Sequence, residues 1–425
     1  MLRTLYYVQK LMRSQWYSGE KLERLQSRKF RRLVERAFNE VPYYRRLYAP
    51  EAVKKVLADG KQAAAHLPII TREELAQTPL QDRTSSLVNP RSCLKRTTSG
   101  SSGIPLVILE DKSSAAWWTA GHIRYLWAYG VRPGYKIAWL SSIQNRRGVS
   151  FLEGRLFKLT RPEPSILDLR DSYGKSFPQL VKLRPEVIIA PPSTLEMLMH
   201  YCEQNNAKLN PKIIAAGSEA LTASLRSRVR DFFSAEVYDR YSAVETGNIA
   251  WECPSHVGYH VNVETVMLEL ANPKQATRSC LEGEAVVSCL YRHATPIIRY
   301  LLGDVVRMKD DECPCGRNLP LVESIQGRKV DNIKRRNGEQ VSPYTVISCL
   351  DHIEGVRKFK VVQNADHVVD VFLVVSEDAN EEVVADTVAK QLGDVLKDLP
   401  LRVKVVDSIP HGEKMKFKLV ESHVS

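Results

Sequence analysis

The sequence lacks any run of about 18 uncharged apolar residues, the length that a membrane-spanning helix needs. Its beginning, MLRTLYYVQKLMRSQWYSGEK, also lacks the uninterrupted apolar core of a secretory signal. Eight cysteines are spread over 425 residues, and only Cys313 and Cys315 lie close together, so a disulfide framework is not expected. These absences predict a cytoplasmic protein without a membrane span.

Basic residues outnumber acidic ones, and the formal net charge is +12. Residues 1–50 hold twelve Lys and Arg against four Glu, an excess that can bind nucleic acid or an anionic membrane. However, apolar residues recur at helical spacing through residues 21–48, so these charges fit the solvated face of packed helices. No base-stacking platform or known module accompanies them, so nucleic acid is not an expected partner. Docking of a phosphate-rich cofactor or a carrier protein is the functional alternative.

The chain is longer than the size at which one hydrophobic core stops growing, so more than one domain is expected. Residues 1–90 have the apolar spacing of helices. Short apolar runs then alternate with helical stretches, a pattern typical of parallel α/β layers: LVILE, KIAWLSS, EVIIAPPS and KIIAAGS. The segment 255–325 is rich in β-branched residues and turns and predicts mostly antiparallel sheet.

A polar, basic stretch at residues 327–340 changes the composition. Beyond it we expect a helix near 343–353, the strands VRKFKVVQ and VVDVFLVVS, a helix near 380–397 and the strand LRVKVVD. The sequence therefore predicts an α/β fold with a large N-terminal domain, residues 1–328, which contains a β-rich part. A small C-terminal α+β domain, residues 329–425, follows it.

The stretch RTTSGSSGIPL packs five hydroxyl side chains and two glycines into Thr97–Gly103. A flexible linker would be flanked by polar sequence, but the strand-like LVILE follows at once. Glycines that free the backbone, together with hydroxyls and amides, suit a loop that holds an anionic phosphate chain. The loop lacks the Gly-Lys-Ser/Thr ending of P-loop nucleotide-binding proteins. Ile104 and Leu106 flank its proline, so the loop has no lysine of its own.

Six motifs follow one another in the order and approximate spacing of the adenylate-forming superfamily, which includes acyl-CoA synthetases, luciferases and peptide-synthetase adenylation domains. They are TTSGSSGIP, AAGSEAL, YSAVETG, RYLLGD, GRKVDNIKRRNGEQVSP and a lysine-rich stretch near the C-terminus. The segments FNEVPYYRRLY, ATPIIRYLLGD and CPCGRNLPLVESIQGRKVDN resemble the phenylacetate-CoA ligase branch, which also includes capsular polysaccharide biosynthesis proteins. The resemblance covers almost the whole chain.

This resemblance implies a nucleotide site with ATP or AMP and Mg²⁺. Glu245 would bind Mg²⁺, a cation that prefers carboxylate oxygen, and would act in catalysis. Tyr241 would stack on adenine, while Asp304 and Arg328 would hydrogen-bond the ribose. The implied nucleotide-binding residues are Thr97, Thr98, Ser99, Gly100, Ser101, Ser102, Gly103, Gly217, Ser218, Glu219, Tyr241, Ser242, Thr246, Asp304 and Arg328.

In this family a lysine on a mobile C-terminal lid domain reaches the substrate carboxylate and the α-phosphate. The sequence here reads HGEKMKFKLVES, which can be aligned with the family's lysine motif in two ways. The register of KFKLV selects Lys416, with Met415 where the family has glycine, and the nearest glycine favours Lys414. We predict Lys416 as the catalytic lysine and keep Lys414 as the alternative. Three lysines on a solvated tail are the non-functional interpretation.

Two short segments carry soft metal ligands. CPCG supplies Cys313 and Cys315, and WECPSHVGYH supplies Cys253 with His256 and His260. Four such ligands from two loops of one β-rich region can form a closed tetrahedral Zn²⁺ site. Cys253, His260, Cys313 and Cys315 are the preferred set, and free thiols are the alternative.

The expected reaction is ATP-dependent activation of a carboxylic acid through an acyl adenylate, with release of pyrophosphate. Transfer of the acyl group to the thiol of coenzyme A would complete it. The alternatives are a carrier-protein or amine acceptor, adenylyl transfer to a hydroxyl group, and a catalytically silent homologue that acts as a scaffold. The expected partners are a small carboxylic acid and coenzyme A or a carrier protein; a homodimer is left open.

The acyl pocket is the least defined part of the site. Trp117, Trp118, His122 and Trp139 lie in segments that would line it, and their aromatic character suits an aryl or other apolar acid. At helical spacing they fit a packed core equally well.

Overall fold

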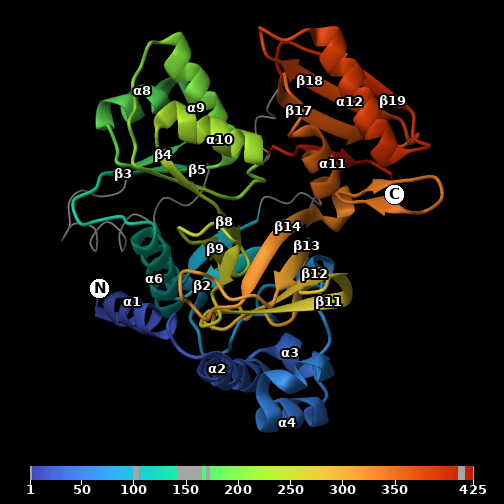
Figure 1. Ribbon diagram of the computed structural model, residues 1–425. Helices are drawn as coiled ribbons and strands as arrows, with labels where there is room; N and C mark the ends of the chain where they lie inside the picture. The colour runs from blue at the N-terminus through green and yellow to red at the C-terminus, as the bar shows by residue number, and fades with distance from the viewer. Residues whose placement is uncertain (1, 99–104, 142–164, 169–172, 410–416, 425) are drawn as a thin grey trace.

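The structure is a computed structural model that describes residues 2–98, 105–141, 165–168, 173–409 and 417–424. Figure 1 shows three parts: a lower part of N-terminal helices and antiparallel strands, an upper part with α8–α10, and a C-terminal part drawn in orange and red. Among the described residues no helix combines the length and apolar character that crossing a membrane requires.

The N-terminal part is helical, as predicted. Leu22, Phe30 and Leu33 are buried along one face of α2, while most of its charged side chains face solvent. The basic excess of this region therefore lies largely on the outer face of packed helices. The helices are α1 (Leu2–Ser14), α2 (Gly19–Glu40), α3 (Pro42–Leu47), α4 (Pro50–Asp59) and α5 (Arg72–Gln77), with 3-10 helices at Gly60–His66 and Pro90–Ser92.

A five-stranded parallel sheet forms the upper part, in the order β4-β3-β5-β6-β7. Strands β5 and β6 are buried along their whole length, because helices cover a parallel sheet on both faces. The strands are β3 (Ile137–Ser141), β4 (Ser165–Asp168), β5 (Val187–Ala190), β6 (Ile213–Ala216) and β7 (Glu236–Tyr238). The helices are α6 (Lys112–Ala128), α8 (Tyr173–Leu183), α9 (Pro192–Gln204) and α10 (Ala223–Phe233).

One strand that was predicted for the parallel sheet lies in a different sheet. LVILE forms β2 (Val107–Glu110), which pairs antiparallel with β1 (Leu94–Thr97) in a separate two-stranded hairpin. Its assignment to the parallel layer was wrong, because a short buried apolar run does not reveal its pairing partner. In sequence, β1 leads into the Ser/Thr/Gly segment and β2 follows it.

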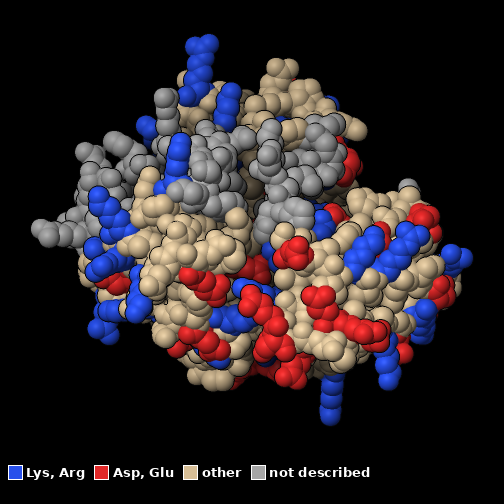
Figure 2. Space-filling view, turned by 90° about the horizontal axis from the view of Figure 1, so that it is seen from above, with Lys and Arg blue, Asp and Glu red and all other residues tan. Residues whose placement is uncertain are grey.

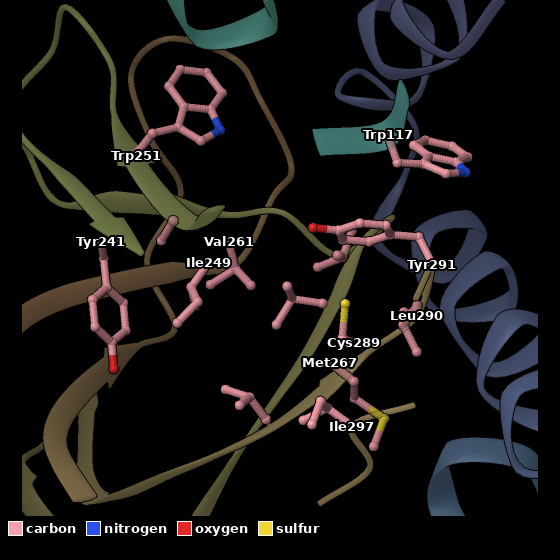
Figure 3. Close-up of a cluster of buried hydrophobic side chains, with 14 of the residues drawn as sticks. Trp117, Tyr241, Ile249, Trp251, Val261, Met267, Cys289, Leu290, Tyr291 and Ile297 are labelled. Carbon is pink, nitrogen blue, oxygen red and sulfur yellow. The ribbon is translucent and has the colours of Figure 1, made fainter. Parts of the chain in front are cut away.

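The predicted antiparallel region, residues 255–325, supplies β10–β14, and the preceding strands β8 and β9, which were not part of the prediction, complete a seven-stranded sheet. Its order is β11-β12-β13-β14-β10-β9-β8, antiparallel throughout. It packs on the N-terminal helices around one large core, part of which is drawn in Figure 3. The strands are β8 (Arg240–Ala243), β9 (Gly247–Glu252), β10 (Tyr259–Val261), β11 (Val266–Thr277), β12 (Cys280–Cys289), β13 (Tyr300–Lys309) and β14 (Leu321–Arg328).

The C-terminal part has a hydrophobic core of its own, between Ile333 and Val420. Its sheet has the order β19-β18-β17-β20, and α11 and α12 match the predicted helices within a few residues. The elements are a 3-10 turn (Lys329–Asp331), β15 (Ile333–Lys334), β16 (Gln340–Val341), α11 (Pro343–Leu350), β17 (Val356–Gln363), β18 (Val369–Val375), α12 (Glu381–Leu396), β19 (Leu401–Val405) and β20 (Val420–Ser422).

Charged side chains join the C-terminal part to α9 and α10. The Lys358 ammonium lies 2.8 Å from Glu196, and the Arg228 guanidinium lies 3.1 Å from the same carboxylate. Asp351 accepts a hydrogen bond of 2.9 Å from the backbone N–H of Ser224 at the start of α10. Seen from above, acidic and basic side chains intermingle on the surface of the molecule and do not form one basic patch (Figure 2). Polar contacts of this kind are typical of domain interfaces that can rearrange.

Candidate active site

Glu245 lies in the tight connection between β8 and β9 and is 7% exposed. Its Oε1 accepts a hydrogen bond of 3.1 Å from the Tyr300 hydroxyl and lies 3.4 Å from Nη1 of Arg72. Gly247 has a φ of +78° and lies against Tyr291, where a Cβ would come within 2.5 Å of the phenol oxygen. The connection therefore needs glycine there, and this turn holds the carboxylate against β13.

Arg72 was not singled out from the sequence, yet it links two predicted site residues. Its Nη2 donates a hydrogen bond of 2.6 Å to the Thr98 hydroxyl, and its Nη1 faces Glu245. Arg72 is the first residue of α5, whose start is capped by the reciprocal Thr71 and Glu74 pair. Ile70 hydrogen-bonds the backbone around Tyr300, which places α5 beside β13.

The two ends of the Ser/Thr/Gly loop are held together. Thr98 is buried, and it exchanges hydrogen bonds with Leu106 through its backbone N–H (3.1 Å) and its hydroxyl (3.0 Å). Thr97 ends β1 and is exposed. The other predicted phosphate-loop residues lie outside the described residues: Ser99, Gly100, Ser101, Ser102 and Gly103.

The predicted ribose and adenine residues meet across β8, β13 and β14. The Tyr241 hydroxyl donates a hydrogen bond of 2.8 Å to Oδ2 of Asp304, and Nε of Arg328 lies 3.5 Å from Oδ1. Asp304 and Arg328 are direct partners in the β13–β14 register. Burial, and then the Asp304 carboxylate, raise the pKa of Tyr241 well above its ordinary value, so the phenol stays a donor. Its ring is largely buried at one side of the core cluster in Figure 3.

The turn at Gly217, Ser218 and Glu219 follows the carboxyl end of β6. Its backbone is tightly constrained: a Cβ on Gly217 would lie 3.1 Å from the Arg240 carbonyl, and Ser218 has a φ of +76°. The Arg240 side chain donates a hydrogen bond of 3.2 Å to the carbonyl of Ala216, which ties β8 to the turn. Ligands of open α/β sheets bind at the carboxyl ends of strands, so the turn is well placed for a nucleotide.

Glu219 also connects the turn to the C-terminal segment. One carboxylate oxygen accepts from the backbone N–H of Ser193 at 3.0 Å, and the other accepts from that of Phe417 at 3.3 Å. Lys418 lies 2.7 Å from Asp331, which ends the 3-10 turn between β14 and β15. Lys414 and Lys416 themselves lie outside the described residues, so the choice between them stays a prediction.

Ser242 and Thr246 flank Glu245. Ser242 is half-buried in β8 and pairs with Asn248, whereas Thr246 is fully buried. The Thr246 hydroxyl has no hydrogen-bond partner among the described residues. Its backbone carbonyl accepts from the Tyr291 hydroxyl at 3.1 Å. Carboxylate and hydroxyl oxygens are ligands that suit Mg²⁺, so Glu245 with Thr246 fits a magnesium site by donor type.

The four aromatic residues considered for an acyl pocket do not form one group. Trp118, His122 and Trp139 form one cluster, with centroid distances of 3.9 Å from Trp118 to His122 and 5.9 Å from Trp118 to Trp139. Trp117 instead stacks on Tyr7 of α1 at 3.9 Å, and Figure 3 shows it far across the core from Tyr241. Trp117 is therefore a packing residue.

His122 is the polar member of this aromatic cluster. It is buried, and its Nδ1 lies 2.9 Å from both the Trp118 carbonyl and the Asn248 amide nitrogen. Burial, and then the positive charge of Arg240, lower the pKa of His122 to about 3. At neutral pH the imidazole is uncharged, so it adds hydrogen bonding and no positive charge to the cluster.

The four predicted zinc ligands come together. The ligand atoms of Cys253, His260, Cys313 and Cys315 all lie within 4.8 Å of one another. His256 points elsewhere: its ring stacks on Tyr238, and Nδ1 lies 3.6 Å from Glu252. Of the two histidines, His260, which belongs to the preferred set, lies beside the cysteines, and His256 does not.

No model of a known protein family matches the chain. Similarity to individual proteins is extensive. The chain is 26% identical to a phenylacetate-coenzyme A ligase of Thermus thermophilus, over 87% of this chain and 86% of that protein. It is 24% identical to protein CapK of Staphylococcus aureus, over 84% of this chain and 79% of CapK.

The fold resembles that of 2-hydroxyisobutyryl-CoA ligase. The TM-score is 0.80 against its postadenylation state, with 19% identity and coverage of 96% of this chain and 91% of the other. Against the thioesterification state of the same ligase, the TM-score is 0.63 at 97% and 92% coverage. The chain is thus a sequence relative of the phenylacetate-CoA ligases and has the fold of the adenylate-forming acyl-CoA ligases, as its motifs predict.

Proposed function

We propose that this protein is an AMP-forming acid–thiol ligase, which activates a carboxylic acid with ATP and passes the acyl group to coenzyme A. One observation carries the proposal: residues from five distant segments gather around β8 with the chemistry that adenylation needs. Thr98 and Arg72 lie on one side of Glu245. Asp304 accepts a hydrogen bond from Tyr241, and the neighbouring Arg240 donates one to the carbonyl of Ala216, directly before the Gly217–Glu219 turn.

In the first half-reaction a carboxylate oxygen of the acid attacks the α-phosphorus of ATP. The new O–P bond forms as the bond to the bridging oxygen breaks, and pyrophosphate leaves with that electron pair. Thr97–Gly103 and Arg72 would hold the β- and γ-phosphates, and Asp304 with Arg328 would hold the ribose. Glu245, with Thr246 beside it, would hold Mg²⁺, which offsets phosphate charge when bound. The Tyr241 hydroxyl orients the Asp304 carboxylate.

In the second half-reaction the thiol of coenzyme A attacks the acyl carbon. The thioester bond forms, AMP leaves with the former carboxylate oxygen, and the thiol proton passes to water. The contacts of Phe417 and Lys418 bring the segment after Lys416 to the Gly217–Glu219 turn and to Asp331. The TM-score is higher against the postadenylation state of the neighbour than against its thioesterification state, which supports an arrangement like that of the postadenylation state.

The acid is proposed to occupy the space beside Trp118, His122 and Trp139. The two tryptophans are half-buried, and the uncharged His122 is held by the Trp118 carbonyl next to Asn248. Aromatic walls favour an aryl or other apolar acid, because their faces offer stacking contact without polar partners. The names of the sequence relatives support a coenzyme A acceptor, and a carrier-protein thiol is the alternative.

A panel of aryl, branched aliphatic and hydroxylated carboxylic acids tests the function. With ATP and Mg²⁺, we expect pyrophosphate release that depends on the acid, and with coenzyme A we expect AMP and a thioester in equal amounts. Pyrophosphate release without thioester, until a carrier protein or an amine is added, would select that acceptor. Absence of acid-dependent pyrophosphate release across the panel would favour the scaffold alternative and contradict the proposal.

Arg72 supplies the positive charge that the phosphate loop lacks. Its guanidinium touches the hydroxyl of Thr98 at the base of the loop, and it is only 19% exposed. A guanidinium presents several donors to phosphate oxygens and stays charged at all working pH values. We therefore expect Arg72 to contact the β- or γ-phosphate of ATP during the first half-reaction.

Replacement Arg72→Ala is expected to lower kcat/KM for ATP by about 10- to 100-fold, the loss typical of a charge-assisted hydrogen bond. Binding of AMP should change little, because AMP lacks the β- and γ-phosphates. Arg46→Ala is the matched control, since Arg46 pairs with Asp82 on the surface. Initial-rate kinetics and AMP titration measure both effects. An equal loss of ATP and AMP binding would make Arg72 a structural residue.

A further inference from the structure

A compact group of soft ligands lies at the end of the antiparallel sheet, away from the residues assigned to the nucleotide. Cys253 follows β9, His260 is the middle residue of β10, and Cys313 and Cys315 lie in the connection from β13 to β14. The Cys253 and Cys313 sulfurs are 3.5 Å apart, and the Cys315 sulfur is 3.2 Å from Nε2 of His260.

These distances are close to those of a tetrahedral zinc site. With Zn–S bonds near 2.3 Å and a Zn–N bond near 2.0 Å, neighbouring ligand atoms lie about 3.5 to 3.8 Å apart. The four ligand atoms of the group are all within 4.8 Å of one another, and the sulfurs are not joined by a disulfide. Cys253 and His260 are 0% exposed, so both ligands are withdrawn from water.

We propose that Cys253, His260, Cys313 and Cys315 bind one structural Zn²⁺ ion. Three sulfur ligands and one imidazole complete a tetrahedron, so the site has no open position for a substrate or a water molecule. Such a site stabilises the fold and takes no part in the reaction. The chain itself supplies every ligand, from three neighbouring segments of one sheet.

The positive charge of the neighbouring Arg317 suits a zinc site that contains three thiolates. Three thiolates exceed the charge of a divalent zinc ion by one unit, and the positive charge of Arg317, close to Cys315, offsets this excess. The Arg317 guanidinium also lies over the rings of Trp16 and Trp251, at 4.7 and 5.3 Å from their centroids. With Arg317 included, the positive and negative charges of the proposed site therefore cancel.

The proposed ion would join several parts of the fold. Arg317 donates a hydrogen bond of 3.0 Å to Gln15, and Asn318 donates one of 3.1 Å to the Tyr17 carbonyl. The loop that carries Cys313 and Cys315 is thus hydrogen-bonded to the residues that follow α1. Strand β9 begins beside Glu245, and β14 ends at Arg328. Zinc would hold these strands together at the ends opposite the nucleotide residues.

Metal analysis of the full-length protein, purified without added zinc or chelator, tests this inference. We expect about one zinc ion per chain, in keeping with a closed four-ligand site. Protein stripped of metal and reloaded with Co²⁺ alone should show the intense visible bands of tetrahedral cobalt and charge transfer from thiolate. Both measurements are independent of catalytic activity, so their failure is distinct from a failure of the proposed function.

Variants of single ligands identify the site. His260→Ala and Cys313→Ser are each expected to lose most of the zinc and the cobalt spectrum, whereas Cys202→Ser and Cys349→Ser, outside the group, should keep both. Because ligand variants can unfold, wild-type protein is also treated with a chelator, which should lower its unfolding temperature. Wild-type protein that neither contains zinc nor binds Co²⁺ after reduction would overturn the proposal. Zinc retained in full by both ligand variants would overturn the assignment of ligands.

Discussion

Glu245→Gln is expected to lower acid-dependent pyrophosphate release by about 100- to 1,000-fold, the loss typical of removing one preorganised electrostatic group from an active site. Glutamine preserves the size of the side chain and can still accept from the Tyr300 hydroxyl, which lies 3.1 Å from Glu245. It removes the negative charge that Mg²⁺ prefers as a ligand. The loss should therefore come with a higher Mg²⁺ requirement, measured as the rate of pyrophosphate release across a Mg²⁺ titration.

Glu282→Gln is the matched control for this variant. Glu282 lies in β12 of the same sheet, where it pairs with Arg307 at 2.8 Å in a half-exposed position. Removing that pair should leave the rate and the Mg²⁺ requirement unchanged, because surface ion pairs contribute at most about 1 kcal/mol to stability. A Glu245→Gln enzyme with more than half of the wild-type rate and an unchanged Mg²⁺ requirement would contradict the role of Glu245.

Lys416→Ala is expected to abolish most ATP–pyrophosphate exchange, with a loss of about 100-fold or more, since its ammonium would stabilise negative charge that develops around the α-phosphate. Thioester formation from a supplied acyl adenylate should be largely retained, because that step does not require attack at phosphorus. Exchange of labelled pyrophosphate measures the first step, and coupling of synthetic acyl adenylate to coenzyme A measures the second.

Two neighbouring lysines provide the controls. Lys414→Ala should keep exchange within a few-fold of wild type if Lys416 is the catalytic residue. Lys418 pairs with Asp331 at 2.7 Å, so Lys418→Ala tests whether disturbing the same segment is enough to cause the loss. Intact exchange in Lys416→Ala together with lost exchange in Lys414→Ala would transfer the assignment to Lys414. A similar loss in all three variants would indicate a general disturbance of the segment.

Much of the architecture was predictable because it depends on local patterns. β-branched residues predicted β10–β14 of the antiparallel sheet, and the periodicity of α11, α12 and β17–β19 predicted the C-terminal elements. β2 is an exception, because its apolar run suits a buried strand of any sheet. Its antiparallel pairing with β1 depends on the loop between them and on what packs against it.

Arg72 shows why part of the site was missed. The sequence TREEL predicts a capped helix, and no neighbouring residue in the sequence distinguishes its arginine from an ordinary surface charge. Only the backbone contacts of Ile70 with β13 bring Arg72 within 3.4 Å of a carboxylate 173 residues away in sequence. The corresponding signal in the sequence was indirect: a phosphate loop without a lysine needs a cation from elsewhere.

The sequence by itself determined the chemical types at the nucleotide site, because glycines, hydroxyls and carboxylates stand at fixed spacings in contiguous motifs. It also determined which residue types were available for a metal. Tertiary structure alone decided that the ligand atoms of the preferred set, His260 among them, meet in space, that Trp117 packs on α1, and that Arg72 adjoins Glu245. Those outcomes depend on strand register and on long-range packing, where a shift of one residue turns a side chain to the opposite face.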